Sequence, residues 1–226
     1  MIKRISNIIN QKIFIFSERT KINRKGTLIN AFNESNTIFI HIPKTAGISL
    51  VNGIYGDVSN EGHRKVDFYK KIFTKKFKKF FLFSFVRNPY DRLYSAFKFL
   101  QAGGMNIHDQ NAYKQHLIGF EDFEDFIFNG LNNEIVNEIV HFKLQSEFIC
   151  NNSGEIIVDF VGKYENIDKD LSKLSMLINK DIFLPHLNKG KAKQKYDQIY
   201  TNEMKGIVYK MYRRDFEIFN YKKCLN

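Results

Sequence analysis

The chain has 226 residues, of which 43% are hydrophobic and 15% are aromatic, enough for one domain that buries on the order of 70% of its unfolded surface. This apolar content excludes a disordered chain, and the composition excludes collagen-like, coiled-coil and low-complexity proteins. Lysine and arginine number 35 against 24 aspartate and glutamate residues, a net charge of +11. We therefore expect an anionic partner, such as a nucleotide, a nucleic acid, an anionic glycan or a membrane surface.

The sequence lacks the usual signals for membrane insertion, secretion and zinc binding. Its most apolar run, residues 80–86, is far shorter than the roughly 18 residues that a membrane-spanning helix needs. The basic start is followed by a short apolar patch without a cleavage site of small residues. Cys150 and Cys224 form no C-x-x-C pair, so neither a disulfide framework nor a structural zinc is predicted. With the lysine-, asparagine- and isoleucine-rich composition, these features favour a bacterial, cytoplasmic protein.

Residues 1–36 are polar, basic and only weakly periodic, so we interpret them as a loosely attached N-terminal arm, with dimerisation and docking on a membrane surface as its two candidate roles. A single domain is predicted from residue 37 to 226, because no linker or internal repeat divides it. It begins with a β-branched and aromatic stretch, residues 37–42. This stretch predicts a strand that leads through a loop at 43–47 into a helix at 48–55.

The same pattern of strand, loop and helix recurs further along the chain. Residues 80–86 predict a strand buried on both faces, and Pro89 fits the first position of a helix over 90–100. Between the two strands, lysines and aromatic residues spaced by three and four predict an amphipathic helix at 66–79. Its lysine face is interpreted as solvated, with a polyanion groove as the alternative.

Two strands joined by a crossover helix run parallel. The predicted fold class is therefore α/β, a single domain with a central parallel β-sheet flanked by helices. The second half is predicted to be mainly helical, with residues 101–120 as a variable loop that helps to form an acceptor pocket. Its expected elements are helices at 121–128, 134–148 and 168–178, a strand at 156–164, a basic loop at 184–195 and a closing helix that Thr201 caps and that ends at about 219.

The first loop has the residues of an anion-binding site. A buried strand that turns into a helix presents unpaired backbone N–H groups, to which the helix dipole adds positive charge. In residues 43–49, Lys44 supplies a charge, Thr45 and Ser49 supply hydroxyl donors, and Gly47 lets the backbone approach the ligand. The loop is thus similar to a P-loop, but its lysine precedes the glycine, which disfavours a kinase or ATPase.

Two segments together resemble a known family. Residues 41–49 (His-Ile-Pro-Lys-Thr-Ala-Gly-Ile-Ser) and 85–96 (Phe-Val-Arg-Asn-Pro-Tyr-Asp-Arg-Leu-Tyr-Ser-Ala) resemble the paired cofactor motifs of the carbohydrate sulfotransferases of sulfotransferase family 2. That group includes heparan 2-O-sulfotransferases and many bacterial proteins. The resemblance implies that 3'-phosphoadenosine-5'-phosphosulfate (PAPS) is the sulfuryl donor. The weaker matches that follow extend the resemblance from about residue 37 to 222.

The resemblance also implies which residues hold PAPS. Arg87 and Ser95 match the positions that bind the 3'-phosphate, and an arginine can grip a phosphate with two parallel hydrogen bonds. Ile48 stands where the family more often has a threonine, which removes one hydroxyl donor. Tyr164 resembles the tyrosine that contacts adenine, and Lys189 lies in a basic segment, 188–193, that resembles the one closing over the nucleotide. The implied 5'-phosphosulfate loop consists of Lys44, Thr45, Ala46, Gly47, Ile48 and Ser49.

Sulfuryl transfer needs an in-line geometry, stabilisation of the leaving phosphate and a base for the acceptor hydroxyl. Lys44 suits the second role. His63 is the candidate base, because an imidazole titrates near neutral pH and the matching Gly-His of the similar glycan enzymes carries their catalytic histidine. Glu61 is the alternative base. This scheme needs no metal, and no cluster of metal ligands is evident in the sequence.

Other polar residues have simpler interpretations. His41, inside a predicted strand, is interpreted as a hydrogen-bonded core histidine. His141 and Gln145, one helical turn apart, either line an acceptor cleft or face solvent. Asp91 is interpreted as a charge at the N-terminal end of a helix.

We expect a PAPS-dependent sulfotransferase that acts on a hydroxyl of a carbohydrate or glycoconjugate, with no nucleic acid as partner. A nucleotide-dependent phosphotransferase is one alternative, but the sequence offers neither a Walker lysine nor a carboxylate assigned to magnesium. A non-enzymatic protein that binds polyanions through the lysine-rich helix is the other, and its affinity would fall steeply as salt rises.

Overall fold

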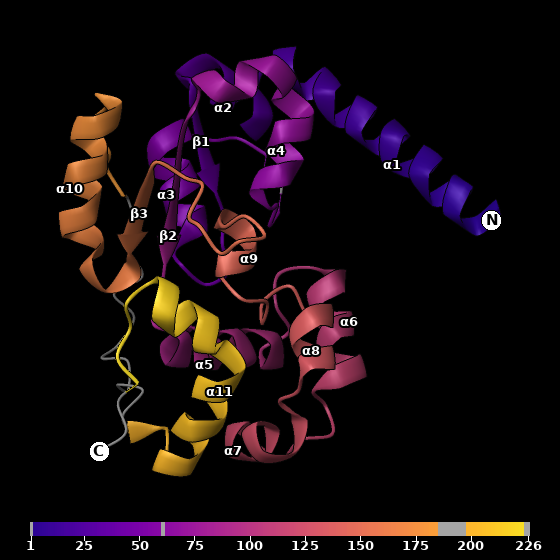
Figure 1. The fold of residues 1–226 in the computed structure, drawn as a ribbon, viewed down its shortest axis with the longest axis vertical. Coiled ribbons are helices and arrows are strands. Elements are labelled where there is room, and N and C mark those ends of the chain that lie inside the picture. The colour runs from indigo at the N-terminus through magenta and orange to yellow at the C-terminus, as the bar shows by residue number, and fades with distance from the viewer. Residues whose placement is uncertain (1, 60–61, 185–197, 224–226) are drawn as a thin grey trace.

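A computed structural model of the chain describes residues 2–59, 62–184 and 198–223 (Figure 1). Its sheet has three strands in the order β1 (Thr37–Ile40), β2 (Phe81–Val86) and β3 (Phe160–Lys163), and both pairings are parallel. Phe39 pairs with Phe83 across the first ladder, and their rings stack with centroids 5.3 Å apart. The prediction of an α/β domain with a central parallel sheet is confirmed.

Helices cover both faces of the sheet in the upper part of Figure 1. Their apolar residues share one core with the strands, in which Ile38, Leu50 and Phe83 are buried. The apolar stripe of each helix explains this packing, since burial of such a stripe provides most of a helix's stability. These helices are α2 (Leu28–Ser35), α3 (Gly47–Tyr55), α4 (Val66–Phe73) and α10 (Ile167–Ile178).

The N-terminal segment forms more structure than the sequence indicates. Helix α1 (Ile2–Thr20) projects from the body of the molecule in Figure 1. Thr27 caps α2 by accepting a hydrogen bond from the backbone N–H of Asn30. Leu28, Ile29 and Phe32 of α2 are buried in the core that contains the sheet. The structure therefore places α2 inside the domain and not in a separate arm.

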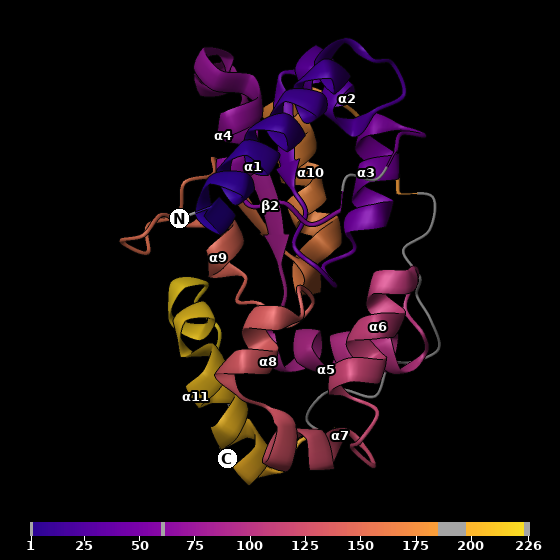
Figure 2. The same cartoon turned by 90° about the vertical axis from the view of Figure 1, so that its right-hand side faces the viewer.

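A second group of helices lies beyond the carboxyl ends of the strands, in the lower part of Figures 1 and 2. It has its own core, in which the rings of Phe97 and Phe142 both stack on Phe126, with centroids 5.2 and 5.3 Å away. Thr201 caps the last helix, as predicted. The helices are α5 (Pro89–Gln101), α6 (Ile107–His116), α7 (Phe123–Asp125) with a π-helical turn at Phe126–Gly130, α8 (Asn133–Glu138) and α11 (Asn202–Ile218). The short helix α9 (Ser146–Ile149) instead contributes Phe148 and Ile149 to the core that contains the sheet.

Several predicted elements have different bounds. The helix expected at 66–79 ends at Phe73, and a 3-10 segment (Thr74–Lys79) follows it. The helix expected at 134–148 is divided into α8 and α9, because buried Arg92 donates to the carbonyl groups of residues 141–143 and holds them in a non-helical turn. Of the strand expected at 156–164, only Phe160–Lys163 (β3) pairs with a neighbouring strand. Segment 101–120 contains α6 and is not simply a loop.

No helix among the described residues is both long and apolar enough to cross a membrane.

Candidate active site

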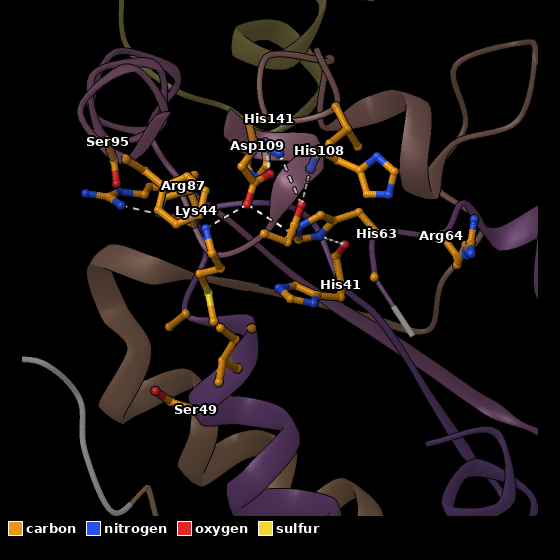
Figure 3. Close-up of a pocket in the computed structure, with 18 of the residues that line it drawn as sticks. His41, Lys44, Ser49, His63, Arg64, Arg87, Ser95, His108, Asp109 and His141 are labelled. Atoms are coloured by element: carbon orange, nitrogen blue, oxygen red, sulfur yellow. Dashed lines mark hydrogen bonds and ion pairs between the residues drawn. The ribbon is translucent and has the colours of Figure 1, made fainter. Parts of the chain in front are cut away.

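A cleft of about 780 Å³ lies where β1 and β2 end, between the two cores. Figure 3 shows Lys44, His63, Asp109 and His141 gathered in it, with Arg87 and Ser95 to one side. The structure brings together nearly all the predicted site residues that it describes, from loops and helices far apart in the chain. Those that line the cleft are Lys44, Ala46, Gly47, Ile48, Ser49, His63, Arg87, Ser95 and Tyr164.

The loop after β1 has an unusual backbone. Lys44 and Ala46 adopt φ values of 68° and 65°, a left-handed conformation that is rare for residues other than glycine and that clusters at binding sites. Ala46 is the N-cap of α3, and its side chain makes no capping hydrogen bond. The N-cap residue thus leaves the start of α3 without a side-chain cap, and this start lines the cleft, an arrangement suited to an anion.

Thr45 differs from its prediction. Its side chain is fully buried, does not line the cleft, and donates from Oγ1 to the carbonyl oxygen of Ile42 at 2.9 Å. The hydroxyl thus braces the loop from inside and is not directed at a ligand. Ser49, one turn into α3, does line the cleft, as expected.

Arg87 connects the two predicted phosphate sites. Its Nη1 donates to the backbone carbonyl of Lys44 at 3.0 Å, and its Nε and Nη2 contact Oδ2 of Asp91 at 2.7 and 2.6 Å. The guanidinium also lies over the ring of Tyr164, 4.4 Å from its centroid. A guanidinium carries more N–H donors than these three contacts use, so donors are left for a ligand. Asp91 therefore orients Arg87, beyond the helix-end role expected from sequence, and Ser95 lies one turn further along α5.

Gln145 fixes the backbone beneath Arg87. Its side-chain amide donates to the carbonyl of Arg87 at 2.8 Å and accepts from the Arg87 N–H at 2.9 Å. It is fully buried, so neither sequence interpretation, an acceptor-lining or a solvent-facing residue, was right. The N–H of the next residue, Asn88, donates to Glu165, whose other carboxylate oxygen accepts from Tyr221. The loop after β2 is thus held by two side chains from distant parts of the chain, Gln145 and Glu165.

His63 has a defined tautomer. Its Nδ1 lies 3.1 Å from the carbonyl oxygen of His41. A carbonyl only accepts, so Nδ1 carries the proton and Nε2 presents a lone pair. Burial lowers the pKa of His63 below its usual value, although the hydrogen bond to His41 and the charge of Asp109 act in the opposite direction. The imidazole is therefore a neutral proton acceptor at pH 7.

Two further histidines pack around His63. The ring centroids of His41 and His141 lie 4.3 and 5.5 Å from that of His63. Burial lowers the pKa of His141 to about 3 and that of His41 well below its usual value, with His63 adding to both shifts. Among the described residues, none is a hydrogen-bond partner for the buried Nδ1 of His41, in contrast to the hydrogen-bonded core residue that its sequence position indicates.

Asp109 is the residue that the sequence analysis missed. Its Oδ2 accepts from the backbone N–H of Met105 at 2.9 Å and from the side-chain amide of Asn106 at 3.0 Å, while Oδ1 faces Nδ1 of His141 at 3.8 Å. No local pattern marks it, because only the fold brings α6 to this cleft. Figure 3 shows Lys44 next to Asp109, and its Nζ lies 3.7 Å from the centroid of the Phe99 ring.

Two predicted residues, Glu61 and Lys189, lie outside the described residues. Within the described ranges, no group of three or more histidine, cysteine, aspartate or glutamate side chains is placed to hold a metal ion.

The sequence of the chain is similar to those of known proteins. Residues 29–222 match the model of the sulfotransferase family. The chain belongs to the sulfotransferase family. Carbohydrate sulfotransferase 11 of Mus musculus is 27% identical over 173 residues, 65% of this chain and 48% of that protein, and its Rattus norvegicus counterpart has the same values. Carbohydrate sulfotransferase 12 of Mus musculus is 23% identical over 191 residues, 70% and 44% of the two chains. No solved structure matches.

This sulfotransferase spans about half the length of the curated relatives that it matches. The family match includes every residue that lines the cleft and excludes α1. The closer likeness to heparan 2-O-sulfotransferases stays a prediction.

Proposed function

We propose that this sulfotransferase moves a sulfuryl group from PAPS to a hydroxyl of a carbohydrate or glycoconjugate. One observation supports this most strongly. Arg87 touches the backbone of the loop that contains Lys44 and lies beside Ser95 in the same cleft. A ligand with an anionic group at each of its two ends, as in PAPS, can bind the Lys44 loop with one group and Arg87 and Ser95 with the other.

The donor set fits this ligand. Lys44, the backbone at the start of α3 (Gly47 and Ile48) and Ser49 would hold the 5'-phosphosulfate. The remaining N–H donors of Arg87, with Ser95, would hold the 3'-phosphate, and Tyr164 offers its ring to the adenine. When bound, PAPS supplies an activated sulfuryl group whose leaving group is a phosphate. Lys44 then stabilises the negative charge that develops on that phosphate.

His63 acts as the base in this proposal. Its Nε2 accepts the proton of the acceptor hydroxyl while that oxygen forms a bond to sulfur and the bond from sulfur to the bridging phosphate oxygen breaks. Because Nδ1 is already bonded to the carbonyl of His41, the lone pair of Nε2 is fixed in direction. The lowered pKa keeps the ring neutral and ready to accept a proton.

A carbohydrate acceptor is supported by the names of the matching relatives and by the polar wall of the cleft. Asn106 and His108, at the start of α6, line the cleft together with Met105. Their amide and imidazole groups can hydrogen-bond hydroxyl groups, and the methionine offers an apolar surface to a sugar ring.

The first experiment is a thermal-shift titration with 3',5'-bisphosphate. A ligand at 100 times its dissociation constant stabilises a protein by about 2.7 kcal/mol. We expect this shift in the wild type and its loss in Lys44→Ala, whereas Lys169→Ala, on the exposed side of α10, should keep it. Label transfer from PAPS to a carbohydrate should then fail in His63→Ala. A larger shift with ATP and magnesium than with the bisphosphate would instead indicate a phosphotransferase.

A further inference from the structure

Helix α1 has an apolar face that the rest of the molecule leaves uncovered. Ile9, Ile13 and Phe16 are spaced by four and three residues and so lie on one side of the helix. Their side chains are 50%, 61% and 71% exposed. Figure 1 shows that α1 extends away from the sheet and its covering helices. Three large apolar side chains in a single exposed row form a patch, unlike isolated exposed residues, and such a patch indicates an interaction surface.

The side of α1 that faces α4 already attaches the helix to the domain. The ring of Phe14 lies 6.2 Å from that of Phe68 in α4, and the guanidinium of Arg64 lies over Phe14 at 5.3 Å. Arg19 donates two hydrogen bonds, of 3.1 and 2.6 Å, to the backbone carbonyl of Lys71. These contacts account for the inner side of α1 and leave the row Ile9, Ile13 and Phe16 without a role in the fold.

A groove of about 620 Å³ runs along this face, with apolar side chains in it and cations at its edges. Ile13, Ile15 and Phe16 supply the apolar part, and Lys12 of α1 and Lys71 of α4 supply charge. Within the part of the chain that the structure describes, neither of these lysine side chains lies within ion-pair distance of a carboxylate. The groove thus combines apolar surface with unneutralised positive charge.

The charge of residues 1–25 indicates which kind of partner can cover this face of α1. Residues 1–25 contain seven lysines and arginines and one acidic residue, Glu18, which is buried and pairs with Lys21. A second copy packed on this face would bring like charges together. A polyanionic saccharide would neutralise the lysines but leave the isoleucines and phenylalanine in water. An anionic lipid surface satisfies both, since acyl chains cover the apolar row and head groups meet the cations.

We propose that α1 docks this sulfotransferase on an anionic membrane surface through Ile9, Ile13 and Phe16, with Lys12 and Lys71 against the lipid head groups. The inner contacts of α1 with α4 stay in place, so docking needs no rearrangement of the domain. The groove and the cleft share no lining residue, so the docking surface is separate from the cleft.

The test is co-sedimentation of the full chain with lipid vesicles. We expect binding to vesicles of phosphatidylglycerol mixed with phosphatidylcholine, weaker binding as salt rises, and none to phosphatidylcholine alone. Ile13→Ser with Phe16→Ser should weaken binding at least tenfold. Lys12→Gln should weaken it about fivefold, and Lys71→Gln by a similar factor, because each basic residue near a membrane adds a comparable attraction.

Matched variants elsewhere on the surface make the test specific. Met176→Ser removes an apolar side chain of α10 that is 74% exposed, and Lys114→Gln with Lys169→Gln removes the same charge as the two lysine changes on the groove. Both controls should bind vesicles like the wild type, and all variants should keep the bisphosphate thermal shift. Absence of vesicle binding, or equal loss in the controls, overturns the proposal. A dimer in size-exclusion chromatography that the double serine variant dissociates, without vesicle binding, would assign the face to a second copy.

Discussion

The imidazole of His41 occupies the space into which a side chain at residue 47 would extend. A Cβ atom placed on Gly47 would lie 1.9 Å from both Cδ2 and Nε2 of the His41 ring. Gly47 begins α3, so the absence of a side chain there lets the helix start directly against the buried histidine. The glycine is thus required by packing, whereas the sequence analysis assigned it to the approach of a ligand.

Gly47→Ala should therefore destabilise the protein. The added methyl group meets a buried ring that cannot move aside freely, and overpacking of this kind costs about 1–3 kcal/mol of unfolding free energy. Urea denaturation of the two proteins measures the difference. Gly206→Ala is the matched control, because nothing lies within 4 Å of a Cβ at that helical position, and alanine should stabilise the helix there by up to about 1 kcal/mol. Equal stability of Gly47→Ala and wild type would show that the ring yields.

The lowered pKa of His63 predicts the shape of the pH–rate profile. The free base is the active form, so kcat/KM should be flat near neutral pH and should fall only below the usual histidine value of about 6.5. Initial rates of sulfuryl transfer between about pH 5 and 8 test this. His116→Asn, on α6 and paired with Glu138, should leave the profile unchanged. A fall of kcat/KM with its midpoint above pH 6.5 would contradict a lowered pKa for His63.

His141 should make the folded protein sensitive to acid. Its pKa is lowered to about 3 in the folded state from 6.5. Above pH 6.5 the residue is neutral in both states and has no effect. As the pH falls from 6.5 toward 3, the unfolded chain binds a proton that the folded chain does not, and the free energy of unfolding decreases by about 1.4 kcal/mol per pH unit. Denaturation of wild type and His141→Asn at several pH values gives the slope of the unfolding free energy against pH for each protein. The two slopes should differ by the amount that uptake of one proton produces. Parallel curves would contradict it.

Local patterns predicted the parts of this site that depend on short segments. The apolar strand, the loop 43–47 and the helix that starts at Pro89 are each encoded within about a dozen residues, and residues of the loop and the helix line one cleft. Such segments could be placed because parallel strands end at a common edge.

Long-range contacts could not be predicted in this way. Asp109 reaches the cleft only because α6 packs on α5, and Gln145 finds the Arg87 backbone 58 residues away. The direction of the Thr45 hydroxyl depends on the left-handed φ values on either side of it, which a sequence without glycine at those positions does not indicate. Sequence patterns therefore do not show which partners the buried polar groups bind.

Arg87→Lys should separate charge from geometry at the proposed 3'-phosphate site. Arginine contacts Asp91, the Lys44 carbonyl and the Tyr164 ring at once and keeps donors for a phosphate. A lysine ammonium retains the charge but has no planar fork, so it cannot make these contacts together. Calorimetric titration with 3',5'-bisphosphate should show affinity reduced at least tenfold, about 1.4 kcal/mol. Arg213→Lys, whose partner Glu217 lies on the exposed side of α11, should bind normally. If Arg87→Lys bound 3',5'-bisphosphate as tightly as wild type, Arg87 would contribute only its charge. The proposal that Arg87 and the Lys44 loop bind the two anionic ends of PAPS would then lose its main support.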